Sequence, residues 1–201
     1  MLYRIEKRDA NKMTTKKTTA IFLIGMMASG KTTIGRRLAD RLGWTFYDAD
    51  REIESRCGVP ISYIFDKEGE AGFRARETQM LAELTCRDAV VVATGGGAPM
   101  FDINRRLLAR GLVIQLVSSV SDIIERTRFD TTRPLLDTED KAARIRAIML
   151  ERGPVYDEVC DERVVTSRKP LDAVVEKILE LDSVRETISR AQAVKTTGDE
   201  R

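Results

Sequence analysis

From residue 20 onward, short apolar runs alternate with longer stretches whose apolar residues recur three and four positions apart. Such runs are typical of parallel strands buried on both faces, and the longer stretches are typical of amphipathic helices. The alternation predicts an α/β fold in which helices flank a central five-stranded parallel sheet. The predicted strands are residues 20–24, 45–47, 89–93, 112–117 and 163–166, and the predicted helices are residues 31–42, 51–57, 61–66, 70–85, 101–110, 121–128, 141–156 and 171–181.

Three segments interrupt this alternation. Residues 51–85 place two or three helices between consecutive strands, which predicts an inserted subdomain. Residues 127–140 are polar and contain Arg133-Pro134, which predicts a mobile loop, and the polar residues 189–201 should fray. The chain is predicted to have three parts: a loosely ordered arm at 1–18, a single domain at 19–184 and a polar tail at 185–201. Within the domain, the core comprises 19–48, 86–126 and 141–184, the insertion is 49–85 and the loop is 127–140.

Charge and hydropathy narrow the classes of partner. The 201 residues include 34 Lys and Arg against 32 Asp and Glu, a net charge of +2 that is too balanced for an ordinary basic nucleic-acid binder. The longest apolar run, residues 20–28, contains a glycine and is far shorter than the roughly 18 residues of a membrane span. Residues 1–19 lack the apolar centre of a signal peptide. We therefore expect a cytoplasmic protein that binds neither nucleic acid nor membrane.

The chain has no histidine and three cysteines, Cys57, Cys86 and Cys160. Their odd number and wide spacing predict no disulfide framework and no zinc motif, which is typical of a reducing compartment. Without histidine, Ser-His-Asp and Cys-His catalysis and histidine-based zinc or haem sites are excluded. Carboxylates, lysines, arginines and backbone groups must therefore carry any chemistry.

The strongest local signal is the segment GMMASGKT, residues 25–32, between an apolar run and an amphipathic stretch. It matches the pattern G-x-x-x-x-G-K-[ST], in which backbone N–H groups cradle polyphosphate. Gly25 and Gly30 allow the turn, Lys31 supplies charge at the β- and γ-phosphates, and Thr32 is placed to bind Mg²⁺. The pattern predicts binding of a nucleoside triphosphate and leaves kinase, GTPase, motor and helicase open. A small-molecule acceptor is favoured, because VVVAT is followed by three glycines and not by an Asp-Glu pair.

Other predicted strand ends carry candidates for an acceptor site. Asp48 and Asp50 end the segment FYDAD, and in an extended chain both carboxylates point the same way, toward Mg²⁺ and a substrate hydroxyl. The alternative is that Asp50 only caps the next helix. The glycines at 95–97 let a ligand approach the backbone, or they form a plain turn. Glu77 lies one helical turn from Arg74 and either holds it for a ligand or forms an exposed ion pair.

Five segments resemble the shikimate kinase family in order and spacing: GMMASGKTTIGRRLADRLGWTFYDADREIE, IFDKEGEAGFRARE, VVATGGGAP, RTRFDTTRPLLD and ERGPVYDEV. The resemblance covers about residues 20–182, and gluconate and adenylate kinases share only its phosphate loop. It implies a three-layer P-loop fold like that of nucleoside monophosphate kinases. It also implies transfer of the ATP γ-phosphoryl group to the 3-hydroxyl of shikimate, in the pathway to chorismate and aromatic amino acids. We expect Mg²⁺ as cofactor, ATP as co-substrate and a monomer.

The resemblance assigns roles to residues at matching positions. Catalysis would rest on Lys31, Asp50 and Arg133, the last carried by the loop 127–140 acting as a lid. The implied ATP site comprises Gly25, Ala28, Ser29, Gly30, Lys31, Thr32, Thr33, Arg126, Arg133 and Arg168. The implied shikimate site comprises Asp50, Arg74, Gly95, Gly96, Gly97 and Arg152, and the implied Mg²⁺ ligands are Thr32 directly and Asp48 through water. Ala28 departs from the glycine common in the family, which tightens the allowed backbone geometry.

The chemistry of Arg74 and Arg152, here called the clamp arginines, agrees with this interpretation. Arg74 and Arg152 can each make bidentate bonds to a planar carboxylate, which favours an acidic acceptor over a neutral sugar. The alternatives are a P-loop kinase for another small acid, such as a gluconate-type enzyme, a nucleotide-dependent switch, and a catalytically silent relative. The triple-glycine loop and the paired arginines argue against the first, the low net charge argues against the second, and the presence of Lys31, Thr32, Asp50 and Arg133 argues against the third. Whether Asp50 removes the hydroxyl proton or only positions the hydroxyl stays open.

Overall fold

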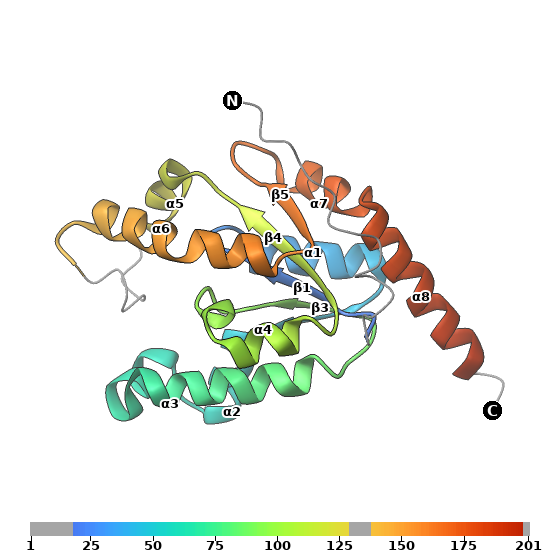
Figure 1. The fold of residues 1–201 in the computed structure, drawn as a ribbon, viewed down its shortest axis with the longest axis horizontal. Helices are drawn as coiled ribbons and strands as arrows, with labels where there is room; N and C mark the ends of the chain where they lie inside the picture. The colour runs from blue at the N-terminus through green and yellow to red at the C-terminus, as the bar shows by residue number, and fades with distance from the viewer. Residues whose placement is uncertain (1–17, 129–137, 199–201) are drawn as a thin grey trace.

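A five-stranded, fully parallel sheet forms the centre of the molecule (Figure 1). The computed structural model describes residues 18–128 and 138–198. Along the sheet the strand order is β2-β3-β1-β4-β5. The strands are β1 (Ile21–Ile24), β2 (Thr45–Asp48), β3 (Val90–Ala93), β4 (Leu112–Val117) and β5 (Glu162–Val165). All five lie within one residue of the predicted bounds, so the predicted fold class is confirmed.

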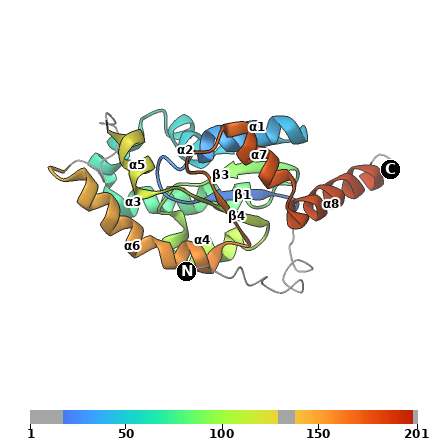
Figure 2. The ribbon, with the colours of Figure 1, turned by 90° about the horizontal axis from the view of Figure 1, so that it is seen from above.

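Helices cover both faces of the sheet, which makes three layers. Alternate residues of β1 point to opposite faces, so Phe22 joins one core cluster and Leu23 joins the other. Figure 2 shows α1 and α7 on one side of the strands and α4 and α6 on the other. The helices are α1 (Lys31–Leu42), α2 (Ala49–Cys57), α3 (Ile61–Leu84), α4 (Asp102–Leu108), α5 (Val120–Thr127), α6 (Lys141–Val159), α7 (Leu171–Leu179) and α8 (Asp182–Gly198).

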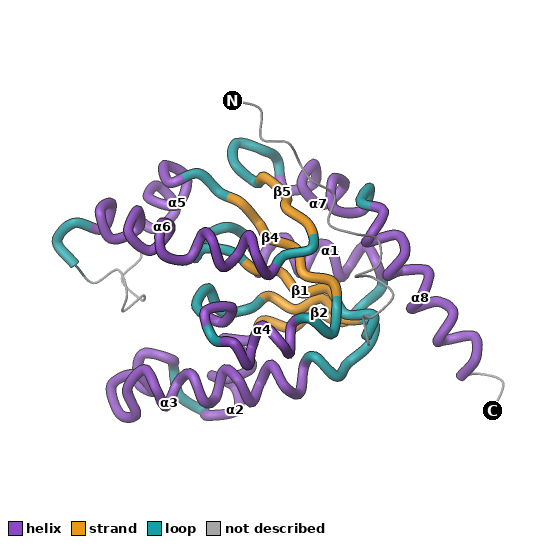
Figure 3. The backbone as a smooth tube through the Cα atoms, in the orientation of Figure 1, coloured by secondary structure: helices purple, strands orange, loops and turns teal. Residues whose placement is uncertain are grey.

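The predicted insertion is the helical pair α2 and α3, which pack against each other. Two helices predicted at 61–66 and 70–85 form the single element α3, within which Gly69 leaves the helical path at φ 69° and ψ −176°. The left-handed φ is one that glycine adopts without steric cost. The bend allows α3 to turn back along the body beside α4 (Figure 3).

The C-terminal expectation is wrong for the described residues. Residues 189–198 were expected to fray, but they continue α8, which extends beyond the rest of the body in Figures 1 and 2. Val184, Thr187 and Ala191 are buried at three- and four-residue spacing. The Thr187 hydroxyl also donates to the carbonyl oxygen of Ser183 at 2.7 Å. A narrow stripe made of these three residues and the half-buried Ile188 therefore holds a helix that is otherwise mostly polar.

Other expectations fall partly outside the described residues. The arm 1–17 and residues 129–137, including Arg133, lie outside them. All three cysteines are free: Cys160 is buried, Cys57 half-buried and Cys86 exposed. Within 18–128 and 138–198 there is no helix long and apolar enough to cross a membrane.

Candidate active site

The phosphate loop, residues 25–32, links the end of β1 to the start of α1. Gly25 and Gly30 have φ values of 138° and 97°, which bulkier residues rarely adopt. Gly30 is the N-terminal cap of α1 and makes no side-chain capping bond, so the first-turn N–H groups stay available to an anion. The predicted need for both glycines is therefore confirmed.

Ala28 is the non-glycine residue of this loop with a left-handed conformation, at φ 57°. An L-residue with a Cβ pays a steric penalty there, which is the tightening expected from the departure at this position. The carbonyl oxygen of Ala28 accepts a hydrogen bond from Arg126 Nη1 at 2.9 Å. Arg126 of α5 is thereby held over the loop.

Two more loop residues are fixed by short polar contacts. Lys31 Nζ donates to the carbonyl oxygens of Gly25 at 2.9 Å and Met26 at 2.8 Å. Thr32 Oγ1 donates to Asp48 Oδ2 at 2.6 Å. The ammonium group and the hydroxyl–carboxylate pair thus lie at the mouth of the loop, where phosphate and metal would meet them.

The structure corrects the expected geometry of the Asp48–Asp50 pair. Asp48 ends β2 and caps α2, because its Oδ1 accepts the N–H of Arg51 at 3.4 Å. Asp50 lies in the first turn of α2, so the two residues do not share an extended segment, and Asp50 is not the cap. Both side chains nevertheless line the same cavity of about 470 Å³.

This cavity gathers most of the predicted nucleotide ligands. Its wall includes Ala28, Ser29, Gly30, Lys31, Thr32, Thr33 and Arg126, with Gly96 on the acceptor side. The described lining residues include Lys169. They do not include its neighbour Arg168, which was predicted to bind ATP. Sequence analysis missed Lys169, Thr94, Thr166 and Leu171, which also line the cavity. The position of Thr94 and Thr166 directly after β3 and β5 was a usable signal, because parallel sheets bind ligands at that edge.

The residues on this wall suit a hard divalent cation. Thr32 Oγ1 and Asp48 Oδ2 face each other at hydrogen-bond distance, and both are oxygen donors of the type that Mg²⁺ takes. No group of three or more His, Cys, Asp or Glu side chains gathers to hold a metal within 18–128 and 138–198. One hydroxyl and one carboxylate match an ion that keeps waters and takes its other ligands from phosphates.

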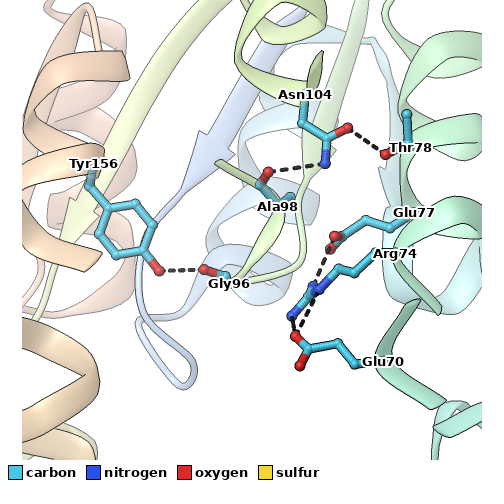
Figure 4. A network of polar contacts seen from close by, with 8 residues as sticks. All are labelled: Glu70, Arg74, Glu77, Thr78, Gly96, Ala98, Asn104 and Tyr156. Atoms are coloured by element: carbon cyan, nitrogen blue, oxygen red, sulfur yellow. Dashed lines mark hydrogen bonds and ion pairs between the residues drawn. The ribbon is translucent and has the colours of Figure 1, made fainter. Parts of the chain in front are cut away.

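On the acceptor side, α3 carries a buried ion pair (Figure 4). Arg74 Nη1 lies 2.9 Å from Glu77 Oε2, and Arg74 Nη2 lies 3.0 Å from Glu70 Oε1. Glu77 is fully buried, so the alternative of an exposed ion pair is wrong. Burial raises the pKa of Glu77 to about 7, although the charge of Arg74 opposes the shift.

The glycine loop, residues 95–97, follows β3 and lies against these charges. A Cβ on Gly95 would stand 2.4 Å from Glu77 Oε1 and 3.0 Å from Asp50 Oδ1. A Cβ on Gly97 would stand 2.5 Å from Arg74 Nη2. A plain turn would not require such short distances. The glycines therefore allow the charged side chains of Glu77, Asp50 and Arg74 to approach the backbone.

A second arginine faces the same loop from α6. Arg152 is only 8% exposed, and its Nη1 lies 3.8 Å from the point where a Gly96 Cβ would stand. Its buried Nε has no hydrogen-bond partner among the described residues. Because a buried guanidinium is costly without partners, this geometry favours a bound anion between Arg74 and Arg152.

Comparison with known proteins agrees with this geometry. Residues 27–182 match the family model described as shikimate kinase. The shikimate kinase of Halorhodospira halophila is 53% identical over 161 residues, which cover 80% of this chain and 91% of that protein. The chain belongs to the shikimate kinase family. The shikimate kinase of Bordetella avium is 49% identical over 79% of this chain and 77% of its own.

Solved shikimate kinases share the fold as well. One from Acinetobacter baumannii in complex with shikimate has a TM-score of 0.79 at 43% identity, covering 84% of this chain and 95% of that one. Another, from Aquifex aeolicus, has a TM-score of 0.70 at 36% identity and covers 80% of this chain and 94% of that one. A gluconokinase from Sinorhizobium meliloti, at 16% identity and a TM-score of 0.50, shares the fold alone.

The buried carboxyl of this shikimate kinase family member predicts a pH dependence of stability. The pKa of Glu77 is about 7 in the folded state, above the usual value of 4.5, so the unfolded chain loses this proton first. The contribution of Glu77 is therefore fully present below about pH 4.5 and lost as the pH rises through about 7. The full loss is about 3 kcal/mol, since one pKa unit corresponds to about 1.4 kcal/mol.

Urea unfolding of the wild type, E77Q and E83Q between pH 4.5 and 8 measures this effect. Glu83 is the matched control, because its bond to Arg56 lowers its pKa and removes it from this pH range. The free energy of unfolding should fall with pH in the wild type and E83Q and should fall less in E77Q. Parallel curves for all three proteins would show that Glu77 titrates normally.

Proposed function

We propose that the protein transfers the γ-phosphoryl group of ATP to the 3-hydroxyl of shikimate, giving shikimate 3-phosphate and ADP. The observation that carries this proposal is the convergence of two buried arginines, Arg74 and Arg152, on a glycine loop beside the phosphate-loop cavity. Such a pair fits a planar carboxylate, which shikimate has next to its ring hydroxyls. Membership of the family supports the same reaction.

On the nucleotide side, the phosphate loop would bind the polyphosphate of ATP. The free N–H groups at the start of α1 would donate to phosphate oxygens, and Lys31 would exchange its two carbonyl partners for the β- and γ-phosphates. Arg126 is placed to contribute further charge from α5. Roles for Arg133 on a lid and for Arg168 near adenine rest on the family resemblance, and Lys169 is an additional candidate for the nucleotide wall.

Thr32 would hold Mg²⁺ directly, and Asp48 would hold it through water. When bound, the ion would neutralise charge on the β- and γ-phosphates. The 2.6 Å contact between the two side chains brings both oxygens to one point of the cavity, in support of this assignment.

On the acceptor side, Arg74 and Arg152 would fix the carboxylate and Asp50 would meet the reacting hydroxyl. In the transfer, a bond forms between the hydroxyl oxygen and Pγ while the bond between Pγ and the bridging oxygen of ADP breaks. Asp50 either takes the hydroxyl proton or orients the hydroxyl as the proton leaves. Glu70 and Glu77 hold Arg74 in place by ion pairs at 3.0 and 2.9 Å.

The proposal places the enzyme in the cytoplasm as a monomer with small-molecule substrates only. Neither a nucleic acid nor a membrane is needed for the reaction. The three cysteines form no disulfide with one another, which is consistent with that compartment.

Loss of one of the two arginines, Arg74 or Arg152, should weaken acceptor recognition. An ADP-release assay with Mg-ATP would compare shikimate, quinate and gluconate on the wild type, R74A and R41A. Arg41 is a matched control, since its exposed ion pair joins α1 to Glu176 of α7 and neither residue lines the cavity. Shikimate should stimulate the wild type most, and R74A should lower kcat/KM by about 100-fold, as expected for losing charge-assisted bonds. Equal stimulation by gluconate, or full activity of R74A, would contradict the proposal.

A separate variant tests the role of the acceptor carboxylate. D50N should lower kcat at saturating shikimate by about 100-fold or more, because a positioned base contributes roughly 10² to 10⁴. Titration with an ATP analogue should give unchanged nucleotide affinity. Turnover of D50N close to that of the wild type would exclude Asp50 from catalysis.

A further inference from the structure

The carbonyl oxygens of the glycine loop are all engaged within the protein. The Gly95 oxygen accepts the N–H of Ala98 at 3.2 Å, and the Gly97 oxygen accepts the N–H of Met100 at 3.0 Å. These are local turn contacts. The Gly96 oxygen instead accepts the hydroxyl of Tyr156 at 2.5 Å, a side chain 60 positions away on α6 (Figure 4).

The N–H groups of the same loop are in the opposite situation. No residue within 18–128 and 138–198 accepts a hydrogen bond from the amide of Gly95, Gly96 or Gly97. Backbone N–H groups left unpaired near a cavity are ready donors to ligand oxygens. The loop therefore has its acceptors satisfied and its donors available.

The surroundings of Tyr156 favour the hydrogen bond from its hydroxyl to the Gly96 oxygen. Its side chain is 2% exposed, and its hydroxyl lies 4.0 Å from Met26 Sδ at the start of the phosphate loop. Burial raises the pKa of Tyr156 to about 12, so the phenol keeps its proton and stays a donor across the physiological range. The hydroxyl donates its proton to Gly96, and Arg152 also interacts with this hydroxyl through a side-chain hydrogen bond.

The bond to Gly96 also sets the direction of a donor. In a planar trans peptide the C=O of Gly96 and the N–H of Gly97 point in opposite directions. Fixing the oxygen toward α6 therefore turns the Gly97 N–H away from α6. Gly97 itself lies against Arg74, since a Cβ there would stand 2.5 Å from Arg74 Nη2.

The same helix carries the second clamp residue. Arg152 precedes Tyr156 by four positions on α6, and both side chains are buried toward the loop. We propose that Tyr156 is a positioning residue for the acceptor, which locks the Gly96–Gly97 peptide in register with Arg152 so that the loop amides face the substrate. The proposal rests on the proposed function, because the acceptor is taken to be shikimate.

A merely structural tyrosine would behave differently. If the ring only filled space, loss of its hydroxyl would change stability and leave acceptor affinity intact. If the hydroxyl orients the loop, its loss would weaken binding of the acceptor much more than binding of ATP, because the atoms nearest to Gly97 belong to Arg74 and not to the phosphate loop. The split between the two affinities separates these roles.

The test compares Y156F with Y47F in the ADP-release assay and in calorimetric titrations of shikimate and an ATP analogue. Tyr47 is the matched control, because its hydroxyl accepts a bond from the exposed Arg87 at 2.6 Å. Y156F should raise the KM and Kd for shikimate about tenfold, the worth of about one hydrogen bond, with ATP affinity and kcat within twofold. Y47F should match the wild type.

Two results would overturn the inference: shikimate affinity of Y156F equal to that of Y47F, or equal losses for shikimate and ATP. Absence of shikimate-dependent ADP release by the wild type would instead overturn the proposed function. Should Y156F not fold, ¹⁵N-glycine NMR of the wild type decides. Shikimate should then shift the amide signal of Gly97 and slow its hydrogen exchange, and an unaffected Gly97 amide would contradict the proposal.

Discussion

The absence of side chains at Gly95 and Gly97 is the constraint on which the acceptor side of the molecule depends. A Cβ at either position would stand 2.5 Å or less from Glu77 Oε1 or from Arg74 Nη2, closer than a real Cβ approaches any atom. Only glycine therefore lets the end of β3 and the ion pair of α3 share this space. Because β3 pairs with β1, the same loop lies beside the phosphate-loop cavity.

Burying charged side chains in this space costs free energy, and the partners of each charge indicate its role. Glu77 is fully buried and compensated by Arg74, whereas the Nε of Arg152 is buried without a described partner. A stable protein gains nothing from an incompletely paired guanidinium, since buried ion pairs seldom repay their desolvation. A carboxylate ligand supplies the missing partner. The desolvation free energy of these charges thus serves recognition of the ligand. Burial of the large apolar clusters on both faces of the sheet offsets it.

Local patterns predicted the strands well, because β1, β3 and β4 are short, apolar and buried. They could not predict that α2 begins at Ala49, directly after Asp48 ends β2, which places Asp50 in a helix and not in the extended chain. The burial of Glu77 could not be predicted either. An i, i+3 ion pair has the same sequence pattern whether solvent or a glycine loop covers it. Lys169 was missed because loop residues carry no periodic signal, and α8 was missed because its buried stripe is narrow and the rest of the helix is mostly polar.

The central claim is that two buried arginines select the acceptor by its carboxylate. Calorimetric titration of the wild type with shikimate and with its neutral methyl ester tests this most directly, since the two ligands differ only at the carboxyl group. We predict that the ester binds about 100-fold more weakly, or not measurably, because it has no negative charge to pair with the two guanidinium groups and leaves the buried Nε of Arg152 without a partner. Equal affinity for the acid and the ester would contradict the account.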